Sequence, residues 1–139
     1  MSGRLVLDAS AGLHAVLPGP AAAEALDALA EAVVVVAPDL YCFEVANTLW
    51  KYIRSRRVTL ERGVTVYERA LSLVDRLVGA NELAKEVLAL AAVASRPVYD
   101  MSYAVLARRE GAAVLTADRA FAAALRREKI GVRLLSAAG

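Results

Sequence analysis

Four acidic side chains in this sequence occupy positions from which they could take part in chemistry. Asp8 directly follows three consecutive apolar residues, and Asp118 stands two residues after the apolar stretch 112–116. Glu44 and Asp100 each lie near the start of a segment with helical character. Carboxylates packed together repel one another unless a cation neutralises them, and a site with oxygen ligands alone suits Mg²⁺ or Mn²⁺. Such an ion can activate water for attack on a phosphodiester, so the four acids predict a metal-dependent site for phosphoryl chemistry.

Each acid also has a structural explanation. Asp100 and Asp118 stand where a side chain could cap a helix by accepting a backbone N–H bond. Asp8 is harder to explain in this way, because a carboxylate that closes a buried strand needs a partner. Glu44 lies on a polar helical face of a kind that commonly faces solvent, and this face also contains Asn47, Thr48 and Lys51.

The hydrophobic pattern predicts an alternation of short strands and helices. Strands are expected at residues 4–8, 33–36, 112–116 and 132–135, and helices at 20–31, 38–56, 60–78, 82–94, 100–109 and 119–127. This alternation implies a central parallel sheet with helices on both faces, so we expect a single three-layer α/β/α domain over residues 1–139. In such sheets ligands bind at the carboxyl ends of the strands, which is the edge where Asp8 and Asp118 are expected.

The composition excludes several classes of protein. The 139 residues are 58% hydrophobic and 23% charged, with one His and one Cys. A zinc site of Cys and His needs about four ligands, so Cys42 and His14 cannot form one, and no disulfide can form within the chain. The purest apolar run, 32–37, is far shorter than the ~20 residues of a membrane-spanning helix, and no signal-peptide core is expected. We therefore expect a cytoplasmic protein without a membrane partner.

The net charge of +2 hides an uneven distribution. Residues 51–76 and 108–139 each contain seven basic and three acidic residues, whereas residues 1–50 contain one basic and six acidic residues. If the fold gathers the basic side chains on one face, they could follow a phosphate backbone, with candidate RNA contacts at Lys51, Arg54 and Arg119. The alternative is that these charges lie on solvated helix faces.

Four segments resemble the motifs of the PIN domain, and within that family those of the VapC-like toxin ribonucleases. Residues 5–10 (LVLDAS) resemble the first motif, a strand that ends in Asp with Ser or Thr two residues later. Residues 43–51 (FEVANTLWK) resemble the second, in which a helical Glu is followed three residues later by Asn. Residues 98–107 and 115–121 resemble the third and fourth motifs. All four occur in the family's order, and the resemblance covers Leu5 to Leu135.

The resemblance implies an endoribonuclease that hydrolyses RNA phosphodiester bonds with Mg²⁺ or Mn²⁺. By the same resemblance, Ser10 and Thr116 would support the site with hydrogen bonds, and Asn47 would orient it. A homodimer and a cognate VapB-like antitoxin are further expectations. The catalytic and metal-binding acids would be Asp8, Glu44, Asp100 and Asp118.

The sequence departs from the family pattern in three places. Met101 stands where Ala is more usual, which should matter only for packing. Residues 119–121 occupy the place of an additional acid found in some members, which leaves open whether one or two metal ions bind. A strand is expected between the helices 60–78 and 82–94, but only Leu77 and Val78 represent it.

Two other functions remain open. A phosphotransferase with an aspartyl-phosphate at Asp8 would use the same sheet edge, but many such enzymes need a second acid where Ser10 stands. A catalytically silent PIN-like module would bind a partner protein, and a lost acid would be its usual mark, whereas all four acids are present. Apolar helical surface for a partner or a second copy could come from Val16, Leu17, Leu26, Leu29, Leu40 and Tyr41.

Overall fold

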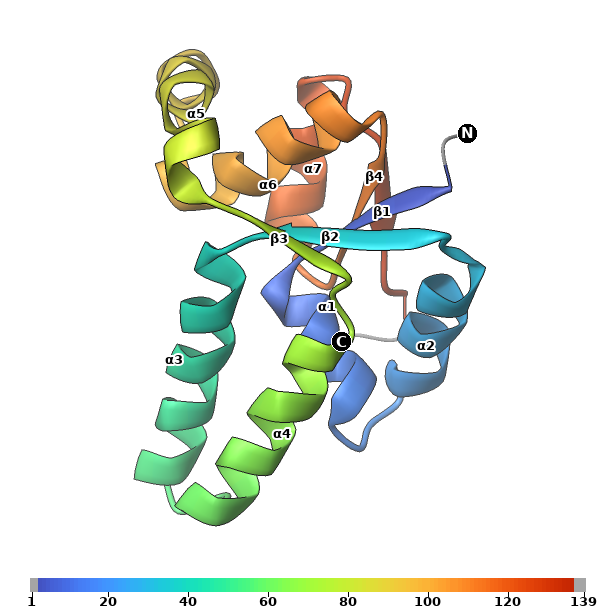
Figure 1. The fold of residues 1–139 in the computed structure, drawn as a ribbon, viewed down its shortest axis with the longest axis vertical. Coiled ribbons are helices and arrows are strands. Elements are labelled where there is room, and N and C mark those ends of the chain that lie inside the picture. The colour runs from blue at the N-terminus through green and yellow to red at the C-terminus, as the bar shows by residue number, and fades with distance from the viewer. Residues whose placement is uncertain (1–2, 137–139) are drawn as a thin grey trace.

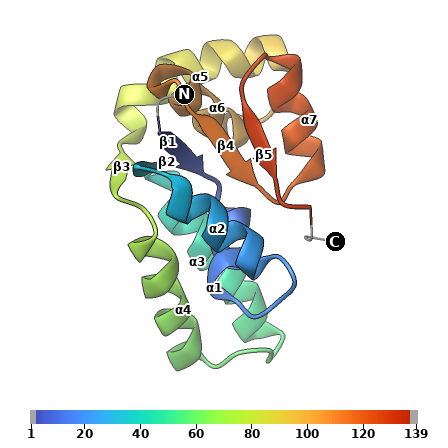
Figure 2. The ribbon, with the colours of Figure 1, turned by 90° about the vertical axis from the view of Figure 1, so that its right-hand side faces the viewer.

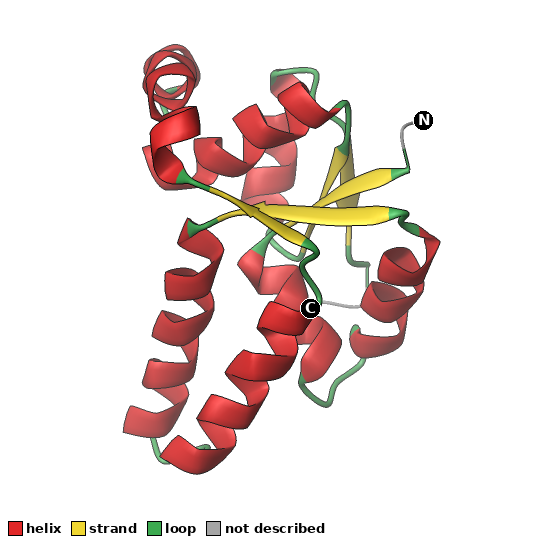
Figure 3. Cartoon of the chain, in the orientation of Figure 1, coloured by secondary structure: helices red, strands yellow, loops and turns green. Residues whose placement is uncertain are grey.

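The computed structural model of this protein describes residues 3–136 and centres on a five-stranded sheet. All neighbouring strands are parallel, and their order is β3-β2-β1-β4-β5. Figure 3 shows the strands crossing between two groups of helices. The strands are β1 (Arg4–Leu7), β2 (Val34–Pro38), β3 (Arg76–Val78), β4 (Ala113–Thr116) and β5 (Val132–Leu134).

Helices cover both faces of the sheet, so the predicted three-layer α/β/α fold with a central parallel sheet is confirmed. Four helices pack on one face: α1 (Ala9–Val16), α2 (Ala22–Glu31), α3 (Leu40–Arg54) and α4 (Leu60–Ser72). Three pack on the other: α5 (Ala80–Ala94), α6 (Val98–Glu110) and α7 (Arg119–Arg127). In Figure 1 the first group lies below the sheet and the second above it, and Figure 2 shows the same division after a quarter turn.

Alternate side chains of each strand supply the two cores. Leu5 and Leu7 of β1 pack into the layer of α1–α4, whereas Val6 between them packs into the layer of α5–α7. Leu115 and Val114 of β4 divide in the same way. Because both faces are covered, the strands read as continuous apolar runs rather than as alternating ones.

Helix α1 was not predicted, and its Gly12 explains both the omission and the packing. Glycine weakens a helix by about 1 kcal/mol relative to alanine, so the short segment after Asp8 carries a weak helical signal. A Cβ at Gly12 would collide with the hydroxyl of Tyr41 on α3. That hydroxyl donates to the carbonyl oxygen of Ala70 on α4 at 2.7 Å, so Tyr41 joins three helices beneath the sheet.

The boundary between α4 and α5 also differs from the prediction. The expected helix 60–78 ends at Ser72, and β3 then occupies Arg76–Val78, which includes the weakly signalled Leu77-Val78 pair. Asp75 fixes this strand, since its Oδ2 accepts the backbone N–H of Val35 at 2.8 Å and its own N–H donates to the Val35 carbonyl. Apolar residues continue the helical spacing through this segment without a Gly or Pro, which is why the helix was predicted too long.

Candidate functional site

The carboxyl ends of the strands lead into the segments that carry the predicted acids. Asp8 follows β1 directly, Asp118 follows β4 by two residues, and Glu44 lies in the second turn of α3, which follows β2. In Figure 1 this edge lies where β2 and β3 lead into α3 and α5. The fold therefore brings three of the four acids to one edge, and α6 adds Asp100 in its first turn.

Asp8 is held by two hydroxyl groups rather than used as a helix cap. It is the residue before α1, yet its side chain makes no capping bond. Ser10 Oγ and Thr116 Oγ1 both donate to its Oδ2, each at 2.7 Å. Neither hydroxyl engages Oδ1, so the two bonds fix the orientation of the carboxylate and leave that oxygen to other ligands.

The same two hydroxyls connect β1 to the turn after β4. Ser10 Oγ accepts the backbone N–H of Ala117 at 3.0 Å, and the fully buried Thr116 accepts that of Asp118 through Oγ1 at 3.0 Å. Each hydroxyl thus donates to Asp8 while it accepts from the turn that carries Asp118. This network couples the position of the first acid to that of the fourth.

Glu44 is joined to α6 by a tyrosine that the sequence analysis did not single out. Tyr103 donates its hydroxyl to Glu44 Oε1 at 2.6 Å, although α3 and α6 pack on opposite faces of the sheet. Tyr103 is buried and its ring meets that of Phe121 edge-on, with centroids 6.4 Å apart. Its place three residues after Asp100, one helical turn along α6, is the signal that could have identified it.

The acids act on one another through space. Burial raises the pKa of Glu44 to about 7; the Tyr103 bond opposes this shift, and the charges of Asp8 and Asp100 add to it. Burial also raises the pKa of Asp8, the Thr116 and Ser10 bonds oppose the rise, and the charges of Asp100 and Asp118 strengthen it. Desolvation and mutual repulsion therefore disfavour the ionised forms of Asp8 and Glu44, an effect that a bound cation would oppose.

Asp100 is not a helix cap, contrary to one sequence interpretation. Helix α6 begins at Val98 with Pro97 as its N-cap residue, so Asp100 lies in the first turn. There its Oδ2 accepts a bond from Arg96 Nη2 at 2.8 Å. The predicted helix 100–109 starts two residues too late, because Asp100 resembles a capping residue, whereas the helix follows Pro97 directly.

Asp118 does cap a helix, as one sequence interpretation held. It is exposed, and its Oδ1 accepts the backbone N–H of Phe121 at 3.0 Å at the start of α7. The remaining candidates lie on the surface. Asn47, Lys51 and Arg54 are exposed on α3, and Arg119 is exposed beside Asp118. The guanidinium of Arg54 stacks on the half-exposed ring of Trp50, 4.7 Å from the ring centroid.

The donor set fits a hydrated divalent cation better than a closed cage. Among residues 3–136, no three His, Cys, Asp or Glu side chains lie close enough to hold one ion directly. The charges of the acids at this edge nevertheless raise the pKa of Asp8 and of Glu44, and the acids offer oxygen alone. Mg²⁺ suits such a place, because it keeps several of its waters and commonly binds through one or two carboxylates.

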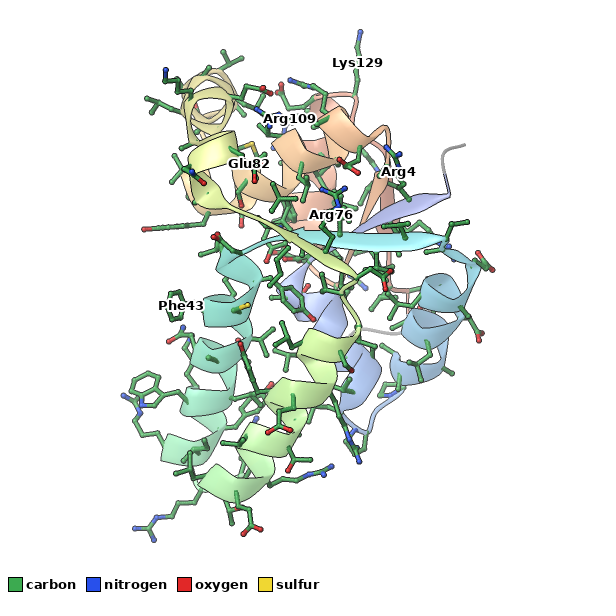
Figure 4. The ribbon with its side chains drawn as sticks, viewed as in Figure 1. Arg4, Phe43, Arg76, Glu82, Arg109 and Lys129 are labelled. Atoms are coloured by element: carbon green, nitrogen blue, oxygen red, sulfur yellow. The ribbon has the colours of Figure 1, made fainter. Side chains whose placement is uncertain are left out.

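An apolar pocket of about 550 Å³ opens between α3, α5 and α6 and was not predicted. Phe43 and Tyr99, the residues that precede Glu44 and Asp100, both line it. Phe43 is 79% exposed and points away from α3 in Figure 4, and Tyr99 is 61% exposed. The rest of the lining comes from the end of β2, the residue before α3, and the helices α3, α5 and α6, and it includes Leu40, Leu83, Val87 and Val98.

The apolar surface differs from the one expected. Tyr41 is fully buried, and Val16, Leu17, Leu29 and Leu40 pack against the two cores. Of the six residues expected to offer apolar surface to a partner, Leu26 is exposed, with 47% of its surface accessible. Other large exposed apolar side chains include Phe43 and Trp50 on α3 and Leu88 and Val93 on α5. No helix within residues 3–136 is long and apolar enough to cross a membrane.

Comparison with known proteins agrees with the motif resemblance. The family model of the PIN domain matches residues 5–125. Ribonuclease VapC3 of Pyrobaculum aerophilum is 32% identical over 121 residues, which span 86% of this chain and 92% of that protein. The crystal structure of PAE2754, also from Pyrobaculum aerophilum, superposes with a TM-score of 0.71 at 26% identity and covers 87% of this chain and 85% of that one. The chain therefore belongs to the PIN domain family.

Proposed function

We propose that this protein is a ribonuclease of the VapC kind, which hydrolyses RNA phosphodiester bonds with Mg²⁺ or Mn²⁺. The observation that carries the proposal is the fixed carboxylate of Asp8, which two hydroxyls orient at the sheet edge while the charges of Asp100 and Asp118 raise its pKa. The family relationship and the VapC3 relative support the same activity. The acids would be Asp8, Glu44, Asp100 and Asp118.

A bound Mg²⁺ or Mn²⁺ would activate water and neutralise the charge that develops on the phosphate. The residues supply the rest. Ser10 and Thr116 hold Asp8 so that its orientation is fixed before substrate arrives. Tyr103 holds Glu44 from the opposite layer. We propose that Asn47, one turn beyond Glu44 on the exposed face of α3, orients the substrate or a water at this edge.

The surroundings of the acids offer RNA two kinds of contact. Cationic side chains along α3 and at the start of α7, namely Lys51, Arg54 and Arg119, would meet phosphates. Exposed aromatic rings would stack on unpaired bases. This stacking does not depend on the RNA sequence, because every base has a π-face. Phe43 and Tyr99 line the apolar pocket, and Trp50 continues the exposed aromatic surface along α3. Single-stranded RNA is therefore the substrate class that this surface favours.

The same relationship supports two partners. We propose that a VapB-like antitoxin covers the catalytic edge, and that the protein is a homodimer in the cytoplasm. Leu88 and Val93 on α5 are 66% and 78% exposed, and the homodimer would cover them. Analytical ultracentrifugation of the purified chain would show a dimer, and Leu88→Glu would shift it towards the monomer.

Cleavage of labelled single-stranded RNA by the purified chain tests the activity. We expect cleavage with Mn²⁺ or Mg²⁺ and none in excess chelator. Asp8→Asn and Asp100→Asn should abolish cleavage and leave the fold intact, whereas Asp27→Asn, an exposed acid on α2, should cleave like the wild type. Equal cleavage in chelator, or full activity of Asp8→Asn, would contradict the proposal.

A further inference from the structure

Arg96 is an ion-pair partner of Asp100 that the proposed mechanism does not use. It lies in the short connection between α5 and α6, where Ser95 adopts a left-handed backbone conformation with φ of 53°. Its Nη2 reaches Asp100 Oδ2 at 2.8 Å, and the two side chains are 22% and 32% exposed. By comparison, Arg109 and Glu86 form a similar pair between α6 and α5, with side chains 37% and 53% exposed. The Arg96 pair is therefore the more withdrawn from water of the two.

The guanidinium of Arg96 keeps an unused donor in this position. Among the described residues, Nε of Arg96 is a buried side-chain nitrogen without a hydrogen-bond partner. A buried donor without an acceptor is unfavourable, so attraction to Asp100 is what holds the group in this orientation. A planar guanidinium binds best to an anion that presents two oxygens, one to Nε and one to Nη. A phosphate offers that pair of oxygens.

We propose that Arg96 exchanges Asp100 for a phosphate group of the RNA when a divalent cation binds at Asp100. The proposal rests on the proposed function, because it takes both the cation and the RNA from it. The guanidinium of Arg96 and a bound metal ion are both attracted to the negative charge of Asp100 and repel each other, so the two positive groups compete for this carboxylate. Once displaced, Arg96 lies beside the acids, where an approaching phosphate needs a cationic partner. Arg96 would thus be a phosphate-binding residue that pairs with the metal ligand Asp100 until the cation binds.

Binding of Mn²⁺ to the full chain without RNA tests the competition. Isothermal calorimetry should show roughly two- to fivefold tighter binding for Arg96→Gln than for the wild type, the effect expected when a partly exposed ion pair no longer competes. Arg96→Lys should lie closer to the wild type, because it retains the charge. The matched control is Arg109→Gln, which removes the pair of Arg109 (labelled in Figure 4) with Glu86 on α5 and should leave Mn²⁺ affinity unchanged. Unchanged or weaker binding by Arg96→Gln would overturn the competition.

The salt dependence of RNA binding tests the phosphate contact. The concentration of enzyme that half-saturates single-turnover cleavage is measured over a range of KCl concentrations. Loss of one phosphate contact on a single strand should lower the log–log slope by about 0.7 for Arg96→Gln, and not for Arg109→Gln. An unchanged slope would show that Arg96 serves only to fasten the loop to α6. If the wild type fails to cleave RNA, the proposed function and the phosphate contact fall together, while the Mn²⁺ measurement still decides whether Arg96 competes for Asp100.

Discussion

Tyr103 on α6 donates its hydroxyl to Glu44 on α3 at 2.6 Å, and this bond joins the two helical layers across the carboxyl edge of the sheet. The buried phenol and the half-buried carboxyl are each other's polar partner in a largely apolar place. Burial raises the pKa of both groups, and for Glu44 the bond counteracts part of this rise. Tyr103 therefore helps to keep Glu44 ionised as well as in place.

Tyr103→Phe should weaken the site while the core stays filled. The change removes the donor to Glu44, so we expect the pKa of Glu44 to rise further and RNA cleavage to fall by roughly tenfold, the equivalent of one buried hydrogen bond of about 1.4 kcal/mol. The rate of cleavage against pH is the measurement, and its acidic limb should move to higher pH. Tyr52→Phe, at a half-buried tyrosine stacked on Arg57, serves as the control. An unchanged pH profile would mean that the bond does not hold Glu44.

Thr116→Val should lower turnover more than substrate affinity. Valine keeps the shape of the side chain but removes a donor to Asp8 and the acceptor of the Asp118 N–H. We expect a loss of about 1–3 kcal/mol in the free energy of unfolding, because the carboxylate of Asp8 loses one of its two hydrogen-bond donors. Steady-state kinetics should show a lower kcat at similar KM. The control is Thr65→Val on α4, whose hydroxyl bonds only a carbonyl of its own exposed helix. Equal effects of the two changes would argue against a role for Thr116 in placing Asp8.

The free energy of unfolding should fall as the pH rises from about 5 to about 8. The pKa of Glu44 is about 7 in the folded protein against an ordinary 4.5, so between these values the folded state holds a proton that the unfolded chain has released. A raised acid pKa stabilises the folded state at low pH and loses that contribution as the pH passes the folded value, here by up to about 3 kcal/mol. Asp8 acts in the same direction.

Urea unfolding at a series of pH values measures this trend. Glu44→Gln should flatten it and should be more stable than the wild type at pH 8, whereas Glu68→Gln on the exposed face of α4 should follow the wild type. Added MgCl₂ should raise the stability of the wild type at pH 8, because a ligand that binds only the folded state stabilises it. A wild-type stability that rises steadily from pH 5 to 8 would contradict the electrostatic description of the site.

The sequence predicted the strands and the placement of Asp8 well, because both follow from apolar runs that end abruptly. Two features escaped it, each for a physical reason. Helix α1 contains Gly12, which local propensity counts against a helix although tertiary packing under Tyr41 requires it. The end of α4 depends on Asp75, whose pairing with Val35 is a contact between distant segments. Local patterns do not report such contacts.

The candidate site shows the same division between local and distant information. The four acids could be chosen from the sequence because each follows a recognisable local boundary. Tyr103 could not, since it meets Glu44 only when α6 and α3 are brought together across the sheet edge, whereas Arg96 lies four residues before Asp100 and pairs with it locally. The separation of the carboxyl groups was likewise beyond reach, and the structure shows a set of interacting acids rather than a closed cage within the described residues.

The stacked pair of Trp50 and Arg54 on α3 should contribute to RNA affinity away from the chemistry. The two lie about two to three turns beyond Glu44, roughly 9–15 Å along the helix at 1.5 Å per residue. Trp50→Ala should weaken binding of single-stranded RNA by about 1–3 kcal/mol, the usual value for one stacked base, with kcat little changed. Arg54→Gln should in addition lower the salt slope of binding by about 0.7, because it removes one phosphate contact.

Lys129→Gln is the matched control for the charge, because Figure 4 shows Lys129 at the opposite end of the molecule from α3. It should leave both the affinity and the salt slope unchanged. Equal losses of affinity in Arg54→Gln and Lys129→Gln would instead point to long-range attraction by net charge, which acts at any basic position and needs no defined path for the strand. Loss confined to Trp50 and Arg54 would place the RNA along α3, since only a bound strand that passes this ring could distinguish the two ends of the molecule.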